Sequence, residues 1–248
     1  MARVPDDRQV EQSHLRARAV ELSASSSSTA SSLRARRLTW AGVVGPVAFG
    51  LAATVGAIFE DSYLGNDSYL PGGHGGYSHV YNFVSELAAP GSGVAALMTA
   101  GFLLLGASTL VFATSLRILW PAATALTLVI AGSGLTTLLA GTFPCDQGCP
   151  ADGLRSTSQQ LHDGASLATF VLWIAAALVA GWRFRRTRYG WASLALGTVQ
   201  VVAAVALGTL ADRHGDDPVG LVQRISLLSV GLWFVLTTIV VRTRSNQA

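Results

Sequence analysis

The sequence predicts an all-α, polytopic integral membrane protein whose core is a bundle of six transmembrane helices. Half of the 248 residues are hydrophobic and only 12% are charged, whereas a soluble domain carries about 25% charged residues. Six stretches without any charged side chain, 17 to 30 residues long, follow one another along the chain. Because about 20 apolar residues suffice for a helix to cross a bilayer, each stretch can hold one span.

The predicted transmembrane domain covers residues 38–242. Its six spans are expected at about 38–59, 94–116, 120–142, 160–182, 189–210 and 219–241. The preceding segment, 1–37, is polar and rich in Arg and Ser, and such a composition cannot bury a core, so it is predicted to be a disordered cytoplasmic tail. Residues 243–248 form a second, short cytoplasmic tail.

The arginines predict the orientation. With the amino terminus inside, 14 of the 17 basic residues fall on inner segments. Inner loops of membrane proteins carry the excess of positive charge, so both termini are expected in the cytoplasm of a plasma-membrane protein. The arginines are spread over four short inner segments, which argues against a nucleic-acid-binding surface. The lipid bilayer is therefore the partner that the composition indicates.

Small residues recur along the first three spans and predict close helix packing. They are Gly42, Gly50 and Ala53 in the first span, and Gly101, Gly106, Gly132 and Gly134 in the next two. Only residues 117–119 separate spans two and three, which predicts an antiparallel hairpin. Pro46 is expected to be tolerated inside the first span, as proline often is in membrane helices.

A short interfacial helix is predicted over residues 78–87, before span two. Its apolar positions have the spacing of an amphipathic helix: Val80, Phe83, Val84 and Leu87. The other face carries His79, Asn82 and Glu86. We expect this helix to lie on or dip into the outer membrane interface and to end before Pro90.

Both cysteines, Cys145 and Cys149, lie in the outer loop after span three. An oxidising compartment makes a disulfide plausible, although the loop it would close is very small. Zinc binding by this pair alone is weakly indicated, because tetrahedral zinc needs four ligands. A thiol-redox role is disfavoured, because the spacing is CxxxC rather than CxxC. We favour a structural disulfide that is dispensable for folding.

Span four opens with a capping box, Ser156-Thr-Ser-Gln159. His162 then lies about 8 Å into the helix, just inside the membrane rim, and is followed by Asp163. Span six begins near Pro218, so Arg224 lies within its first two turns and needs a protein or water partner. Span five carries one polar side chain near its middle, Gln200.

The rim residues predict a candidate site. Glu86, Asp146, His162 and Arg224 each lie at the outer end of a predicted element, and none can face lipid cheaply. We therefore expect them to converge in one outward-facing polar pocket, in which Arg224 bridges the carboxylates. His162 is the candidate switch or base of this pocket, because imidazole is the side chain suited to proton exchange near neutral pH. The metal-ligand candidates are His162, Asp146 and Glu86; no cofactor or oligomeric state is indicated.

Four short motifs at span ends resemble a known family. They are Ser85-Glu-Leu-Ala-Ala-Pro90, Phe143-Pro-Cys-Asp146, His162 with Ala165, and Gln223-Arg224. In this order they resemble the bacterial six-span membrane family catalogued as domain of unknown function 998. The resemblance covers about residues 38–242 and implies a six-helix membrane protein without an established activity.

A more distant similarity is to alkaline-ceramidase-like hydrolases, which use Ser, Asp and three His around zinc. The resemblance would make Ser85, Asp146 and His162 their analogues. The late HxxxH pair of those enzymes is missing, since His214 stands alone in its loop, and this puts zinc in doubt.

Three functions are consistent with the rim residues. We favour a binding or structural protein, with a lipid or small-molecule ligand or with Arg224 locking the helices together. An alternative is a membrane-embedded hydrolase-like enzyme acting on lipid head groups, with a carboxylate and His162 transferring protons. The other alternative is a proton- or ion-coupled transporter in which the same residues form a gate.

Overall fold

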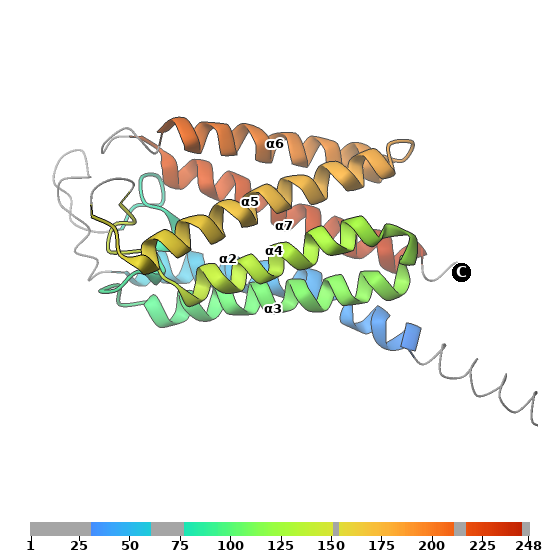
Figure 1. Ribbon diagram of the computed structural model, residues 1–248, viewed down its shortest axis with the longest axis horizontal. Coiled ribbons are helices and arrows are strands. Elements are labelled where there is room, and N and C mark those ends of the chain that lie inside the picture. Colours follow the sequence, from blue (N-terminus) through green and yellow to red (C-terminus); the bar gives the residue numbers. More distant parts are fainter. Residues whose placement is uncertain (1–30, 61–76, 151–153, 211–216, 245–248) are drawn as a thin grey trace, which may run out of the picture.

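The fold is that of a computed structural model, which describes residues 31–60, 77–150, 154–210 and 217–244. Six helices in this part of the chain are long and apolar enough to cross a membrane (Figure 1). They are α2 (Ala41–Phe59), α3 (Ala95–Leu119), α4 (Thr124–Thr142), α5 (Thr157–Arg183), α6 (Arg188–Leu210) and α7 (Val219–Arg244). Two short 3₁₀ helices, η2 (Val84–Ala88) and η3 (Pro121–Ala123), precede α3 and α4. The predicted six-span, all-α fold is confirmed.

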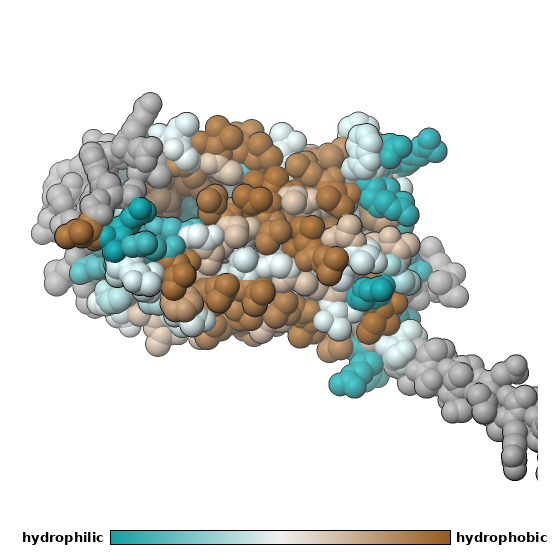
Figure 2. Space-filling view, viewed as in Figure 1, coloured by the Kyte–Doolittle hydropathy of each residue, from teal (hydrophilic) through white to brown (hydrophobic). Residues whose placement is uncertain are grey.

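The surface explains why this chain is a multi-pass membrane protein. On the face shown in Figure 2, hydrophobic residues cover the middle of the bundle, while hydrophilic residues gather at its ends. Large apolar side chains are exposed on every span, among them Ile58, Leu104, Leu128, Leu167, Val202 and Leu228. Such a continuous apolar surface is unstable in water and stable against lipid chains.

The predicted disordered tail is corrected at its end, because residues 31–38 are helical and lead through a turn into α2. Ala35 and the Thr39 side chain are fully buried there. Arg242 of α7 donates to the Arg36 carbonyl, and its guanidinium lies 4.6 Å from the centre of the Trp40 ring. These contacts with α7 order the segment. The rest of the tail, 1–30, and residues 245–248 lie outside the described residues.

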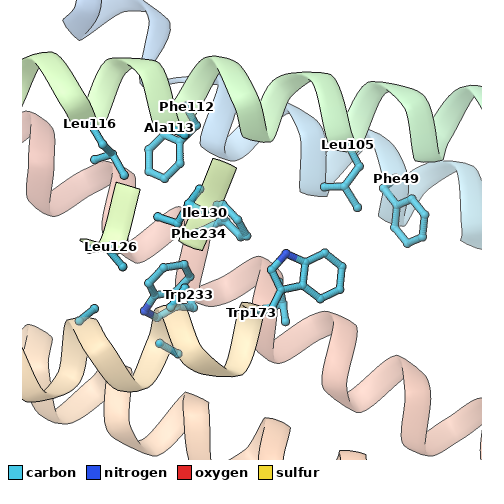
Figure 3. Close-up of a cluster of buried hydrophobic side chains, with 14 of the residues drawn as sticks. Phe49, Leu105, Phe112, Ala113, Leu116, Leu126, Ile130, Trp173, Trp233 and Phe234 are labelled. Atoms are coloured by element: carbon cyan, nitrogen blue, oxygen red, sulfur yellow. The ribbon is translucent and has the colours of Figure 1, made fainter. Parts of the chain in front are cut away.

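The six helices form a ring in which each helix packs against the next one in the sequence. Packing of α2 against α7 closes the ring. Bulky side chains fill its centre, with Trp173, Trp233 and Phe234 facing Phe112 and Ile130 across the bundle (Figure 3). The core therefore consists mainly of aromatic and aliphatic packing.

The α3–α4 hairpin contains the closest helix approach that the sequence predicted. A Cβ atom placed on Gly106 would lie 2.8 Å from the Gly134 carbonyl oxygen and 2.9 Å from the Leu138 nitrogen. A Cβ on Gly134 would lie 3.0 Å from the Gly106 carbonyl oxygen. The two backbones thus contact each other directly, which only glycine permits.

The predicted interfacial helix over 78–87 is corrected in length, type and position. Only Val84–Ala88 are helical, in the 3₁₀ form, and all five residues are buried. The helix η2 packs against α2, α3 and α7 and so closes the end of the ring at which α3, α5 and α7 begin. We refer to residues 77–93 as the plug segment.

Candidate functional site

Arg224 holds the plug segment onto α7. One guanidinium nitrogen, Nη1, donates to the carbonyl oxygens of His79 (2.8 Å), Asn82 (3.1 Å) and Gly220 (3.1 Å). The other, Nη2, donates to the hydroxyl of Tyr77. The centre of the Tyr77 ring lies 5.5 Å from the guanidinium carbon. Arg224 therefore has the protein partner that its position in a span requires. This partner is the plug segment rather than the expected carboxylates.

Glu86 stabilises the same segment from within. Its carboxylate accepts from the Phe83 nitrogen (2.7 Å) and the Asn82 side-chain amide (2.8 Å), and the residue is only 4% exposed. Beside it, the Gln223 side chain of α7 accepts from the Val84 nitrogen at 2.6 Å. These bonds satisfy the first backbone N–H groups of η2, which would otherwise be unpaired in a buried position.

The environment keeps Tyr77 neutral. Burial raises the pKa of Tyr77 to about 12, although the neighbouring Arg224 opposes the shift. Burial and the Arg224 charge lower the pKa of His79 below its usual value. Near neutral pH the Tyr77 hydroxyl therefore accepts from Arg224 and donates to the Phe83 carbonyl oxygen at 3.0 Å.

Glu60, which the sequence indicated only as the end of a span, proves to cap α3. Its buried carboxylate accepts from the Gly93 and Val94 nitrogens, both at 3.2 Å, and from the Ser92 hydroxyl. A carboxylate at a helix N-terminus is favourable, because it pairs free N–H groups and the helix dipole. The signal available in the sequence was an acidic residue directly after an apolar span, together with a following helix that has no acidic residue in its first turn.

Asp146 belongs to a second network, at the start of α5. Its carboxylate accepts from the Ser156 nitrogen (2.9 Å) and hydroxyl (2.6 Å), and these bonds hold the pKa of Asp146 below its usual value. The Ser156 hydroxyl accepts from the Gln159 nitrogen at 3.0 Å, which confirms the predicted N-cap. The second half of the predicted capping box differs, because Asp146 rather than Gln159 pairs with the Ser156 nitrogen.

Gln159 and Asp163 extend this second network. The Gln159 side chain accepts from the Asp146 nitrogen (2.6 Å) and donates to the Asp163 carboxylate (2.8 Å). Asp163 also forms an ion pair with Arg155 at 3.3 Å, with both side chains about 40% exposed. This pair is the only salt bridge within the part of the chain that the structure describes.

His162 joins α5 to the end of α4. Its Nδ1 atom lies 2.9 Å from the carbonyl oxygens of both Ala140 and Phe143. Since both neighbours are acceptors, Nδ1 carries a proton and donates. His162 is 4% exposed and packs edge-on against Phe102. Its bonds thus satisfy carbonyl groups that α4 leaves unpaired at its C-terminus.

The hydrogen bonds divide the four predicted site residues between separate partners. Arg224 and Glu86 bind the plug segment, Asp146 binds the N-terminus of α5, and His162 binds the C-terminus of α4. The expected Asp146–Arg224 bridge is absent from the salt bridges of the described residues. Within the same ranges, no three His, Cys, Asp or Glu side chains are placed to hold a metal ion. The structure therefore does not assemble His162, Asp146 and Glu86 as a ligand set.

A disulfide lies between the Asp146 network and the plug segment. Cys145 and Cys149 are bonded, with their Cα atoms 5.1 Å apart. The Cys149 sulfur lies 3.5 Å from the Ser85 hydroxyl, and the buried Cys145 sulfur lies 3.6 Å from the Ser85 carbonyl oxygen. The disulfide thus packs against η2 and holds the loop after α4 on the plug segment.

Replacing both cysteines with Ser is expected to leave the fold intact and to lower the free energy of unfolding by about 2 kcal/mol, the entropy expected for a very small loop. The bundle loses no span contact in this variant. Thermal unfolding of the purified protein, compared with wild type treated with a reductant, measures the effect. Loss of the folded state would show instead that the disulfide is essential for closing this end of the ring.

A cavity of about 30 Å³ lies beneath η2, in the half of the ring that η2 closes. Its wall comes from η2 and from every span except α6, and none of its lining residues is ionisable. The polar members are Ser85, Thr137, Ser166, Thr169, Trp173 and Gln223. The buried indole N–H of Trp173 has no acceptor within the described ranges. About 10–15 Å³ of such volume accommodates one water, so the cavity has room for a group of roughly two heavy atoms.

Comparison with known proteins gives one match. A family described as "protein of unknown function (DUF998)" matches residues 73–240, which include the plug segment and the last five spans. No curated protein and no solved structure matches the chain. The similarity to ceramidase-like hydrolases therefore receives no support from these comparisons.

Proposed function

This chain belongs to the DUF998 family of proteins of unknown function, and from that premise we propose that it is a non-catalytic binding protein of the plasma membrane. In this proposal, the plug segment closes the outer end of the ring over a cavity that takes the neutral end group of a lipid or small molecule. The bilayer is its principal partner, and nucleic acid is not among its ligands.

The observation that carries the proposal is the cavity beneath η2. Its wall is neutral, and Trp173, one of its lining residues, has a buried indole N–H that lacks an acceptor among the described residues. Burying such a donor without a partner is unfavourable, and a ligand oxygen would satisfy it. Ligand pockets commonly combine an apolar wall with a few polar groups that orient the ligand.

The rim chemistry favours binding over catalysis or ion coupling. Proton transfer needs a carboxylate or imidazole within reach of a substrate. Here the Glu86 and Asp146 carboxylates and the His162 Nδ1 atom bond to backbone groups, and no ionisable side chain lines the cavity. These residues therefore support a structural role for the rim.

Filling the cavity tests the proposal. Ala140 is buried and lines the cavity, so the substitution Ala140→Leu occupies the space of the ligand. Ala125→Leu, on an exposed face of the same helix, is the matched control. Mass spectrometry of compounds released from each purified protein should find a neutral molecule in wild type and Ala125→Leu that is depleted at least tenfold in Ala140→Leu. Equal recovery from all three folded proteins would refute the proposal.

The proposed orientation, with both termini in the cytoplasm, rests on the 14 arginines of the inner segments. Reporter fusions at residues 66 and 150 are expected to report the outer side, and a fusion at residue 186 the cytoplasm. A cytoplasmic signal at residue 150 would reverse the assignment.

A further inference from the structure

Polar contacts connect α6 and α7 at regular intervals. The Tyr189 and Thr237 hydroxyls lie 3.1 Å apart, and the Trp233 indole donates to the Ser193 hydroxyl at 3.1 Å. Further out, the Ser229 hydroxyl donates to the Leu196 carbonyl oxygen at 2.9 Å. Each step moves three or four residues along both antiparallel helices, in opposite directions. One more step leads to Gln200 on α6 and Ser226 on α7.

Gln200 and Ser226 break the pattern. Each is only 1% exposed. Neither polar atom of the Gln200 amide, nor the Ser226 hydroxyl oxygen, has a hydrogen-bond partner within the part of the chain that is described. The pair lies about 10–15 Å below the outer ends of α6 and α7, at 1.5 Å per residue. At this depth the bilayer supplies no water from outside, so unpaired polar groups are costly.

The helix α5 lies along the third side of this position. A Cβ atom on Gly197, one turn before Gln200, would contact Ala177 and Leu178 of α5 at 3.3 Å and 3.0 Å. The same antiparallel register brings the next inward-facing turn of α5 level with Gln200. The unpaired groups thus lie at a junction of three helices, and their burial shields them from lipid.

We propose that Gln200 and Ser226 form a binding site, inside the bundle, for one small neutral group that both donates and accepts hydrogen bonds. This chemistry is that of a water molecule or of a ligand hydroxyl. The Gln200 amide offers one acceptor and two donors, and the Ser226 hydroxyl offers both functions. A buried water typically makes about three hydrogen bonds, which these two side chains can supply. The bound group completes the series of contacts between α6 and α7.

The site is independent of the cavity beneath η2, since neither residue lines that cavity. Among the described residues it also has no charged partner, because the Arg224 guanidinium bonds to the plug segment and to Gly220 of its own helix. An ionised ligand is therefore disfavoured. The other contacts of the series join α6 and α7 directly, whereas this site needs a bound group between the two side chains.

A double-mutant cycle tests whether the two residues share a bound group. Gln200→Leu and Ser226→Ala are each expected to lower the unfolding midpoint by about 3–6 °C. The unfolding midpoint of the double variant should be no lower than that of the less stable single variant, because either change already releases the bound group. Ser229→Ala is the control, since its hydroxyl bonds directly to Leu196 and its effect should add to that of Gln200→Leu. Additive effects of Gln200→Leu and Ser226→Ala, or a raised midpoint, would overturn the proposal.

NMR of the full-length, ¹⁵N-glutamine-labelled protein in deuterated lipid identifies the bound group. The Gln200 amide signal is assigned by its loss in Gln200→Leu. Magnetisation transfer from water to this amide establishes bound water. If transfer is absent, a hydroxyl compound released from wild type and absent from Gln200→Leu establishes a ligand. Absence of both results would mean that the two side chains bond directly, and the proposal would fail.

Discussion

Replacing Arg224 with Met is expected to lower the free energy of unfolding by roughly 3 kcal/mol and to release the plug segment from α7. Hydrogen bonds to a charged group contribute about 1.5–3 kcal/mol, and each half-buried acceptor left without a donor adds a penalty. Arg224 donates to three carbonyl groups and to Tyr77, so the loss exceeds that of one bond. Thermal unfolding measures the loss of stability. Limited proteolysis, followed by identification of cleavage sites between residue 60 and α3, measures the release of the plug segment.

Two variants control this experiment. Arg224→Lys keeps the charge but supplies a compact ammonium group instead of the fork, and should recover less than half of the loss. Arg155→Met removes a charge from an exposed ion pair and should cost less than about 1 kcal/mol. A loss in Arg224→Met no larger than that in Arg155→Met would show that the plug segment does not depend on Arg224.

The second large effect is expected at the α3–α4 contact. Gly106→Ala should destabilise the protein by roughly 3 kcal/mol, the upper range for overpacking. The added methyl group would lie within 2.9 Å of the backbone at Gly134 and Leu138, and backbone of a packed helix cannot move aside as a side chain can. The unfolding midpoint of the purified variant reports the loss.

Gly208→Ala is the matched control for this prediction. A Cβ atom on Gly208, in α6, would have no atom within 4 Å. The substitution should therefore raise stability by about 0.5–1 kcal/mol, the gain for alanine over glycine in a helix. Equal effects of the two substitutions would show that the close approach of α3 and α4 is not required.

The six-span fold was predictable because it depends on short stretches of sequence. Apolar runs of sufficient length and the placement of arginines depend on composition alone, and the Ser156 cap depends on a contact three residues away. Span ends were less predictable: α3 continues to Leu119, about three residues past the expected end of span two, because Arg117 is accommodated in its last turn.

The site was less predictable, because its polar groups bond mainly to backbone. Any residue can supply a carbonyl oxygen, so the residue types at His79 and Asn82 do not indicate that their carbonyl groups bind Arg224. Conversely, two opposite charges near the same end of the bundle suggested an Asp146–Arg224 bridge that the structure does not form. Burial of η2 was also missed, since a polar face that binds other protein groups has the same sequence pattern as one that faces water.

Closure of the ring by α2 and α7 has a consequence for synthesis. Among the six described spans, α2 leaves the ribosome first and α7 last, and they meet through the Thr238 hydroxyl, which bonds to the Thr39 carbonyl, and through Arg242 at the Arg36 carbonyl. Each other span finds its sequence neighbour soon after insertion, whereas one side of α2 must wait for the whole chain. Closure of the ring therefore waits for the synthesis of α7, and a chain that stops before α7 retains exposed packing surfaces on α2 and α6 that quality-control proteases can recognise.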